Sequence, residues 1–241
     1  MAFSNNFSFA SFIIFCLDKD DNIAFEAFWG ETNEDIKTFA NLLHQITTGK
    51  FNKIIFSSTA AVYGSSDIPV TEESTTLPQS PYGHSKLMSE QIIKDAAAAY
   101  GLNYVIFRYF NVAGASMDGK IGEEAANPKN LIPALITSHL GLNLFEFCLY
   151  GNDYPTRDGT CIRDYIHVED LTNAHLKGLN FLESGKSNQI FNLGTGTGTT
   201  VLEIINAFNK VADTKLKYKV VEKREGDPAS VTTNPVKAKE V

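Results

Sequence analysis

Residues 80–109 read SPYGHSKLMSEQIIKDAAAAYGLNYVIFRY and predict a helix followed directly by a strand. Ser80 is a residue type that caps helix N-termini, and Pro81 fits the first helical position. The alanine-rich second half favours continuation of the helix up to Gly101. The apolar run 103–109 then predicts a buried parallel strand.

Residues 52–58, NKIIFSS, predict a second buried strand ahead of that helix, and this strand ends in small hydroxyl residues. Strand, helix and strand in this order are typical of a doubly wound parallel sheet, so we expect the α/β class. Open α/β sheets bind ligands beyond the carboxyl ends of their strands, which places Thr59 at the edge of a predicted cleft.

Tyr82 and Lys86 lie four residues apart in the predicted helix and therefore share one face of it. A lysine cation favours a nearby phenolate, so we expect the pKa of Tyr82 to fall from about 10 toward the range of a general base. The same spacing also occurs on many solvated helices. Together with the Thr59 hydroxyl, the pair would form a proton-relay site.

Other patterns predict further elements. The apolar stretch from Phe9 to Leu17 predicts a buried strand or a poorly ordered terminus, because it lacks the basic leader and the cleavage site of a signal peptide. We also expect helices at 31–49, 129–140, 168–183 and 201–212, and strands at 189–193 and 215–221.

The composition restricts the classes of function. The net charge of −7 and the pI near 5.3 argue against nucleic-acid binding, because phosphates need a basic surface. The apolar stretch at 9–17 is too short to span a membrane. The three cysteines form no C-x-x-C pair and the histidines lack metal-ligand spacing. We therefore expect reduced thiols, no metal site and a cytoplasmic location.

Seven ordered segments between residues 56 and 230 carry a resemblance to a known family. They are FSSTAAVYG at 56–64, SPYGHSKLMSEQI at 80–92, RYFNVAGA at 108–115, NLIPALI at 130–136, YGNDYPTRDGTCIRDYIHVEDL at 150–171, FNLGTGTG at 191–198 and REGDPAS at 224–230. With these segments the chain resembles the extended short-chain dehydrogenase/reductase superfamily and, within it, the UDP-glucose 4-epimerases.

The resemblance implies an incomplete doubly wound, Rossmann-like parallel sheet with an interleaved, smaller C-terminal substrate lobe. Residues 1–115 would be the residual part of the NAD-binding domain, and residues 116–241 would be mainly the UDP-sugar-binding lobe. The implied reaction interconverts UDP-galactose and UDP-glucose through a 4-keto intermediate, with NAD tightly bound.

The matched positions imply catalytic roles for three residues. Tyr82 would be the base, Lys86 would lower its pKa and bind the nicotinamide ribose, and Thr59 would bridge Tyr82 and the sugar oxygen. All three would contact the cofactor, and Phe110 would lie beside the nicotinamide.

The resemblance also implies a binding site for the UDP-sugar. Arg163 and Arg224 would bind the diphosphate, Tyr150 would stack on the uracil, and Asp227 would accept from the ribose hydroxyls. Ser230 is small where some relatives carry a bulky aromatic residue, so we expect the pocket to admit an N-acetyl group. Three more contacts are implied at Asn111, Asn130 and Leu131. We expect Asp164, Tyr165 and His167 to be structural.

The glycine-rich turn at 194–198 follows a predicted strand and precedes a predicted helix, as a dinucleotide-binding loop does. The third glycine of G-x-G-x-x-G would fall at Thr199, and the resemblance places this turn in the later half of the fold. We therefore do not expect it to hold the pyrophosphate. The family's own glycine fingerprint is absent, and we expect about the first quarter of a typical member to be missing.

Alternatives remain beside the favoured epimerase. The missing cofactor loop is consistent with a truncated, non-catalytic remnant that binds only a UDP-sugar or a partner. Another NAD-dependent nucleotide-sugar epimerase or dehydratase is a third interpretation. Ala60 and Ala61 disfavour a dehydratase, because related dehydratases carry an acidic pair at these positions.

A homodimer is an open prediction. Leu87, Ile92, Ile93 and Ala96 would give helix 81–100 an apolar stripe that could pair with a second copy. The same stripe is equally expected of a helix that lies on its own sheet.

Overall fold

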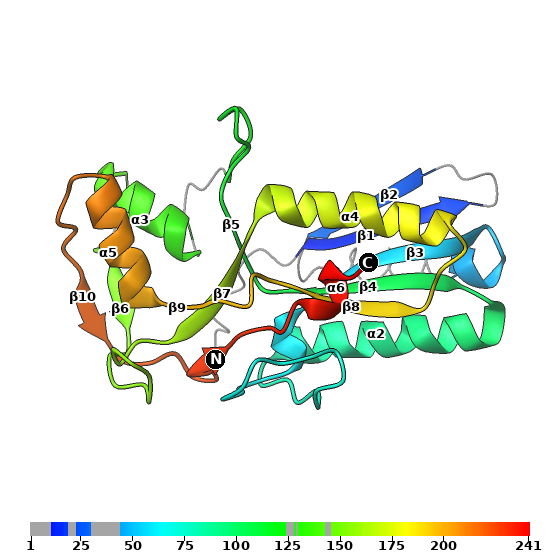
Figure 1. Ribbon diagram of the computed structural model, residues 1–241, viewed down its shortest axis with the longest axis horizontal. Coiled ribbons are helices and arrows are strands. Elements are labelled where there is room, and N and C mark those ends of the chain that lie inside the picture. The colour runs from blue at the N-terminus through cyan, green and yellow to red at the C-terminus, as the bar shows by residue number, and fades with distance from the viewer. Residues whose placement is uncertain (1–10, 19–22, 30–43, 124–127, 129, 143–145) are drawn as a thin grey trace, which may run out of the picture.

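The computed structural model describes residues 11–18, 23–29, 44–123, 128, 130–142 and 146–241, with side chains from residue 44 onward. Its main sheet has the strand order β2-β1-β3-β4-β8 (Figure 1). β3, β4 and β8 run parallel, which confirms the predicted α/β class. The strands are β1 (Ser11–Asp18), β2 (Ile23–Trp29), β3 (Phe51–Thr59), β4 (Asn103–Tyr109) and β8 (Gln189–Leu193).

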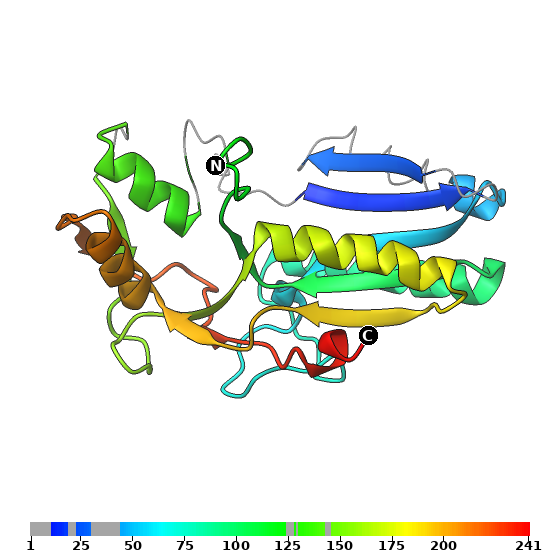
Figure 2. The same cartoon turned by 45° about the horizontal axis from the view of Figure 1, so that its top comes forward.

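β1 and β2 form an antiparallel hairpin on the side of β3 that faces away from β4 (Figure 2). The strand predicted at Phe9–Leu17 is confirmed from Ser11 onward. β1 also runs antiparallel to β3, so the sheet is mixed, a direction that the sequence pattern did not indicate. Of the helix predicted at 31–49, residues 31–43 lie outside the described residues and residues 44–47 are helical.

α2 (Pro81–Tyr100) covers one face of β3 and β4 and matches the predicted helix. The Ser80 side chain accepts a hydrogen bond from the Gly83 amide at 3.1 Å, which fixes the first turn. Gly101 ends the helix at a φ of 72°, in the left-handed region that favours glycine. The buried side chains between this helix and the sheet are Ile54, Phe56, Ile93, Ala96, Leu102, Tyr104 and Ile106.

α4 (Val168–Glu183) covers the opposite face, so the parallel strands lie between two helices (Figures 1 and 2). Successive side chains of a strand point to opposite faces of the sheet, and those of Ile55, Val105 and Phe107 lie on the α4 side. Gly178 lets the helix approach closely, because a Cβ at this position would lie 2.9 Å from the Phe107 ring. Both faces of the parallel strands are therefore buried.

A smaller lobe lies beyond the carboxyl ends of the parallel strands (Figure 1). Its core contains Leu135, Phe147, Leu149 and Ile205. The predicted helices 129–140 and 201–212 are confirmed here, whereas the strand predicted at 215–221 is formed only at 219–221. The lobe consists of α3 (Leu131–His139), β6 (Cys148–Tyr150), α5 (Val201–Val211) and β10 (Lys219–Val221).

Short strands connect this lobe to the main sheet. β8 comes from the second half of the chain yet pairs with β4, so the two parts interleave as predicted. The predicted boundary at residue 115 stays a prediction. The connecting strands are β5 (Asn111–Ala113), β7 (Ile162–His167), β9 (Gly198–Thr200) and β11 (Ser230–Val231), and α6 (Val236–Lys239) follows them.

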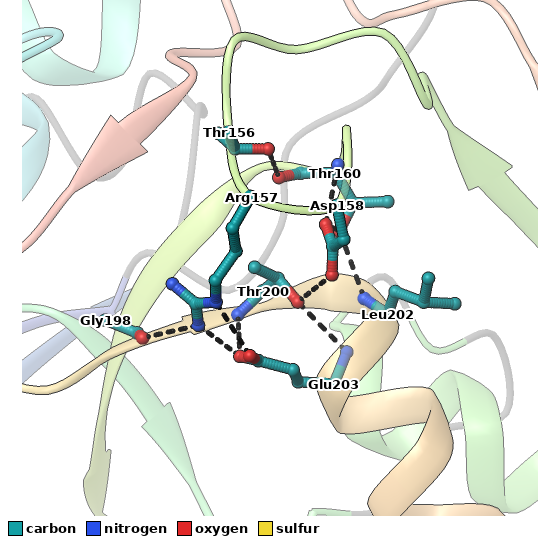
Figure 3. Close-up of polar contacts among 8 residues, drawn as sticks. All are labelled: Thr156, Arg157, Asp158, Thr160, Gly198, Thr200, Leu202 and Glu203. Carbon is teal, nitrogen blue, oxygen red and sulfur yellow. Dashed lines mark hydrogen bonds and ion pairs between the residues drawn. The ribbon is translucent and has the colours of Figure 1, made fainter.

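A polar cluster fastens the loop after β6 to the start of α5 (Figure 3). Asp158 accepts hydrogen bonds from the Thr160 amide at 2.9 Å and from the Thr200 hydroxyl at 2.5 Å. Arg157 forms an ion pair with Glu203, whose carboxylate also accepts from the Thr200 amide. These contacts hold the loop immediately before β7, the strand that carries Arg163.

Candidate active site

Thr59, Tyr82 and Lys86 come together where β3 ends. Thr59 is the last residue of β3 and caps the short 3-10 helix η1 (Ala60–Val62), its Oγ1 accepting from the Ala61 amide at 3.2 Å. The Thr59 side chain also acts on the Tyr82 hydroxyl and lowers the pKa of Tyr82. The Lys86 Nζ lies 5.8 Å from the centroid of the Tyr82 ring. Tyr82 thus lies beside both of the other residues predicted to be catalytic.

Lys86 is fully buried on the sheet-facing side of α2. Its Nζ donates a hydrogen bond to the Ser57 carbonyl at 2.8 Å and lies 5.2 Å from the centroid of the Phe56 ring. Burial lowers the pKa of Lys86 to about 7, and the charge of Glu90 acts in the opposite direction. The amine therefore titrates near neutral pH.

The pKa of Tyr82 departs from the prediction. Burial raises it, and the effect of the Thr59 side chain offsets this only in part. A four-residue spacing places Tyr82 and Lys86 on one helix face, but it does not bring the ammonium to the hydroxyl. Here the ammonium is hydrogen-bonded to Ser57 and lies over the ring, so desolvation of the phenolate prevails.

A cavity of about 380 Å³ lies beside Thr59, between the end of the sheet and the smaller lobe. Its wall contains two arginines and two acids, Glu225 and Asp227. The arginines suit an anionic ligand, because guanidinium groups bind diphosphates in a planar, bidentate way. The predicted site residues that line it are Thr59, Phe110, Asn111, Arg163, Arg224 and Asp227.

The charged wall of this cavity is internally paired. The Arg163 Nη2 donates to the Asp227 carboxylate at 2.5 Å, and the Nη1 donates to the Ile162 carbonyl at 2.7 Å. The Arg224 guanidinium lies 4.0 Å from the centroid of the Tyr150 ring. One face of the aromatic ring predicted to stack on uracil is therefore next to a cation.

Several predicted site residues lie outside the wall of this cavity. Asn130 precedes α3, and its side-chain amide donates to Glu123 at 3.1 Å. Leu131 is packed against the core of the smaller lobe. Ser230 lies in β11 immediately before Val231, which does line the cavity. Tyr150, Tyr82 and Lys86 also stand outside the lining, although the last two adjoin Thr59.

Tyr109 is a cavity residue that the sequence argument missed. It lines the cavity at the end of β4, where it pairs in register with Thr59. Burial and the neighbouring Tyr82 raise its pKa. The available signal was its place in the matched segment RYFN, directly before Phe110.

The glycine-rich turn at 194–198 donates its amides within the protein. Asp164 is fully buried and accepts from the Thr195 amide at 2.8 Å and from the Gly196 amide at 2.9 Å. The same carboxylate accepts from the Thr233 amide at 3.2 Å. These amides are therefore satisfied by Asp164 and are not available to a pyrophosphate, and Asp164 has a structural role here.

The family of this chain follows from comparison with known proteins. The model of the NAD dependent epimerase/dehydratase family matches residues 24–194. The chain belongs to this family. It is 43% identical over 210 residues to the UDP-glucose 4-epimerase of Rhizobium meliloti (strain 1021), covering 87% of this chain and 63% of that protein. It is 38% identical over 240 residues to the UDP-glucose 4-epimerase of Lacticaseibacillus casei, covering 95% of this chain and 72% of that protein.

Solved structures of this epimerase family share the fold. The crystal structure of UDP-glucose 4-epimerase from Brucella ovis in complex with NAD matches with a TM-score of 0.78 at 39% identity, over 85% of this chain and 63% of that one. A UDP-glucose-4-epimerase from Stenotrophomonas maltophila, with bound NAD and formylated UDP-arabinopyranose, matches with a TM-score of 0.79 at 38% identity, over 85% and 62%. The chain thus spans less than two thirds of each of these structures.

The described residues fit the nicotinamide end of NAD better than its pyrophosphate. The threonine hydroxyl, phenol and ammonium beside the cavity suit the nicotinamide ribose, and Phe110 lines the same cavity. In a doubly wound sheet, the glycine-rich turn that binds the pyrophosphate lies at the carboxyl edge of the sheet. It follows the strand next to the point where the strand order reverses. β1 occupies this place beside β3, but its end at Asp18 pairs with Phe51, at the edge opposite Thr59.

Within the part of the chain that the structure describes, no helix is long and apolar enough to cross a membrane. Among the same residues, no group of three or more histidines, cysteines and acids is placed to hold a metal ion.

Proposed function

We propose that this chain provides the catalytic and UDP-sugar-binding parts of an NAD-dependent UDP-glucose 4-epimerase. The observation that carries the proposal is the contact of Tyr82 with Thr59, next to Lys86 and beside a cavity lined by two arginines. Family membership and relatives named UDP-glucose 4-epimerase support it. NAD is the proposed cofactor, because solved relatives contain it.

Each group has a proposed task in the reaction. Burial raises the pKa of Tyr82 in the chain alone. Tyr82 would therefore take the proton of the sugar 4-hydroxyl, and return it, only as the phenolate that the positive charges of bound NAD and Lys86 would favour, while Thr59 orients that oxygen by hydrogen bonding. Bound NAD would supply reversible hydride acceptance at C4. Lys86 would hold the nicotinamide ribose, and Ala60 and Ala61 offer no group for the proton transfers of a dehydration.

The proposed UDP-sugar contacts use the charged wall of the cavity. Arg163 and Arg224 would bind the diphosphate oxygens, and Asp227 would accept from the ribose hydroxyls. Tyr150 would stack on the uracil with the ring face away from Arg224. Asn111 lies in the same cavity wall and would contact the sugar. Asn130 and Leu131 remain proposed nucleotide contacts.

The test is turnover of UDP-galactose to UDP-glucose with added NAD. Tyr82→Phe should lower the rate by about 10²–10⁴-fold, as expected for loss of a general base. Tyr100→Phe is the matched control, because Tyr100 is exposed at the far end of the same helix. Equal rates for Tyr82→Phe and the unmodified chain contradict the mechanism.

A second candidate is UDP-sugar binding without turnover. It is favoured by the direction of β1, which ends at the edge of the sheet opposite Thr59. Calorimetry distinguishes the two candidates. Heat of binding with UDP and none with NAD supports binding alone, whereas saturable binding of both ligands supports the epimerase.

Acceptance of an N-acetylated sugar is proposed from Ser230. Its small side chain precedes Val231 in the cavity wall, so a larger residue here would reduce the space for an N-acetyl group. The test offers UDP-N-acetylgalactosamine and UDP-galactose to the chain and to Ser230→Tyr. The variant should lose the acetylated sugar selectively. Rejection of that sugar by the unmodified chain contradicts the proposal.

A homodimer through α2 and a cytoplasmic location remain proposals. Ile93 and Ala96 from the predicted stripe are buried against the chain's own sheet, and Leu87 packs beside Phe110 and Val62. Met88 and Ile92 are exposed instead, and they would form the dimer contact. Sedimentation of the unmodified chain and of Met88→Glu tests this, with a monomer in both cases counting against it.

A further inference from the structure

Glu90 and Arg108 form a buried ion pair behind the proposed catalytic residues. Glu90 is fully buried and Arg108 is 2% exposed. The Arg108 Nε and Nη2 donate to the two Glu90 oxygens at 2.9 and 2.6 Å. Ser58 donates to the same carboxylate at 2.5 Å, and Arg108 also donates to the Tyr63 hydroxyl at 2.9 Å. Buried pairs with satisfied hydrogen bonds of this kind hold one geometry.

The pair ties the catalytic face of α2 to the sheet. Tyr82, Lys86 and Glu90 follow one another at intervals of four residues and therefore lie on one face of the helix. Lys86 donates to the carbonyl of Ser57, and Glu90 accepts from the hydroxyl of Ser58. Successive residues of β3 thus hold successive turns of α2.

We propose that Glu90 is a positioning residue for Lys86: its carboxylate, held by Arg108 and Ser58 one helical turn away, favours the charged form of the buried Lys86 amine beside Tyr82. The proposal rests on the function proposed above and deepens it. Glu90 touches neither the cavity nor Tyr82, so it would act only through its neighbour.

The charges around Lys86 make Glu90 the acid that matters. Burial disfavours the ammonium, and within the described part of the chain the charge of Glu90 counters that effect. Arg108 is a second buried cation close by, but its charge is compensated by Glu90. Among the described residues, the groups that face Lys86 or its partner Ser57 are Tyr82 and Glu90 on α2, Phe56 on β3, Tyr109 on β4 and His175 on α4. Arg108 on β4 and Lys94 on α2 face Glu90.

The test is direct titration of the Lys86 amine in the intact chain, by NMR of labelled lysine side chains assigned by loss of the signal in Lys86→Arg. Glu90→Gln should lower the Lys86 pKa by about one pH unit or more, because the opposing charge is gone. Glu90→Asp keeps the charge and should retain most of the original value. Asp95→Asn removes an exposed carboxylate from the same helix and should change nothing.

The titration needs neither NAD nor sugar, so its outcome is independent of whether the chain turns over UDP-galactose. Glu90→Gln leaves the buried charge of Arg108 without its partner, which can unfold the chain. If this variant does not fold, the Lys86 pKa is measured instead in the double variant that combines Glu90→Gln with Arg108→Met. A fall in the Lys86 pKa in either folded variant supports the proposal. An unchanged Lys86 pKa overturns it, and so does unfolding of both variants, which would assign Glu90 to the fold alone.

Discussion

Arg163 Nη2 and Asp227 Oδ1 are joined at 2.5 Å across 64 residues of sequence, and both side chains line the cavity. The contact links β7 to the loop before β11, two segments that approach only in the folded chain. It fixes the Arg163 guanidinium in the cavity wall, and the Nη1 of the same group donates to the Ile162 carbonyl. These two contacts hold the guanidinium in one orientation, and a guanidinium that is held in place suits a diphosphate.

Replacing this arginine tests the proposed diphosphate contact. Arg163→Ala should weaken UDP binding about tenfold or more, because a hydrogen bond to a charged group contributes about 1.5–3 kcal/mol. Calorimetry with UDP measures the change. Lys120→Ala is the control, because Lys120 is an exposed cation outside the cavity wall. Equal losses in the two variants would show that the effect is not local to the cavity.

The cap of α5 should be important for stability. Thr200 is fully buried, accepts from the Glu203 amide at 3.0 Å and donates to Asp158. Thr200→Ala should lower the free energy of unfolding by about 0.5–2 kcal/mol, since the variant loses a helix cap. Urea unfolding followed by circular dichroism measures it. Thr172→Ala, at an exposed helical threonine, should change stability by much less.

Local signals in the sequence were sufficient for α2 and β4. The cap at Ser80, the glycine at Gly101 and the apolar run 103–109 act within a few residues of one another, and the observed bounds match. The antiparallel direction of β1 depends on pairing with β3, some forty residues later in the chain, which no local pattern encodes.

The candidate site divides in the same way. The residues Thr59, Tyr82 and Lys86 were identified from motif and spacing, and the structure brings them together. The direction of the Tyr82 pKa was missed, because it depends on burial and on where the Lys86 ammonium is held. Burial and partner choice arise from tertiary packing, which helical spacing alone does not specify.

Close packing of α4 on the sheet gives a third prediction. Gly178→Ala places a Cβ 2.9 Å from the Phe107 ring and 3.2 Å from Ile55. We expect a loss of about 1–3 kcal/mol in the free energy of unfolding, despite the better helix propensity of alanine, because the contact overpacks a buried interface. Thermal unfolding measures it, and Lys177→Ala at the neighbouring exposed position is the control. A stabilised Gly178→Ala variant would mean that α4 shifts freely on the sheet.

The buried amine of Lys86 should make stability depend on pH. Its pKa is about 7 in the folded chain, compared with an ordinary value of 10.5. Between these values the unfolded chain binds more protons, so the free energy of unfolding should rise with pH, by at most about 1.4 kcal/mol per pH unit for one proton. Urea unfolding between pH 7 and pH 10 measures the slope.

Lys86→Met removes the titrating group and should flatten that slope, so the variant should gain most over the unmodified chain at pH 7, where the buried amine is most unfavourable. Lys177→Met removes an exposed lysine from α4 and should keep the original slope. The comparison depends on the difference between the two variants, since other groups contribute equally to both. Parallel stability curves for Lys86→Met and the unmodified chain would contradict the lowered pKa, and with it the view that burial dominates the electrostatics of this helix face.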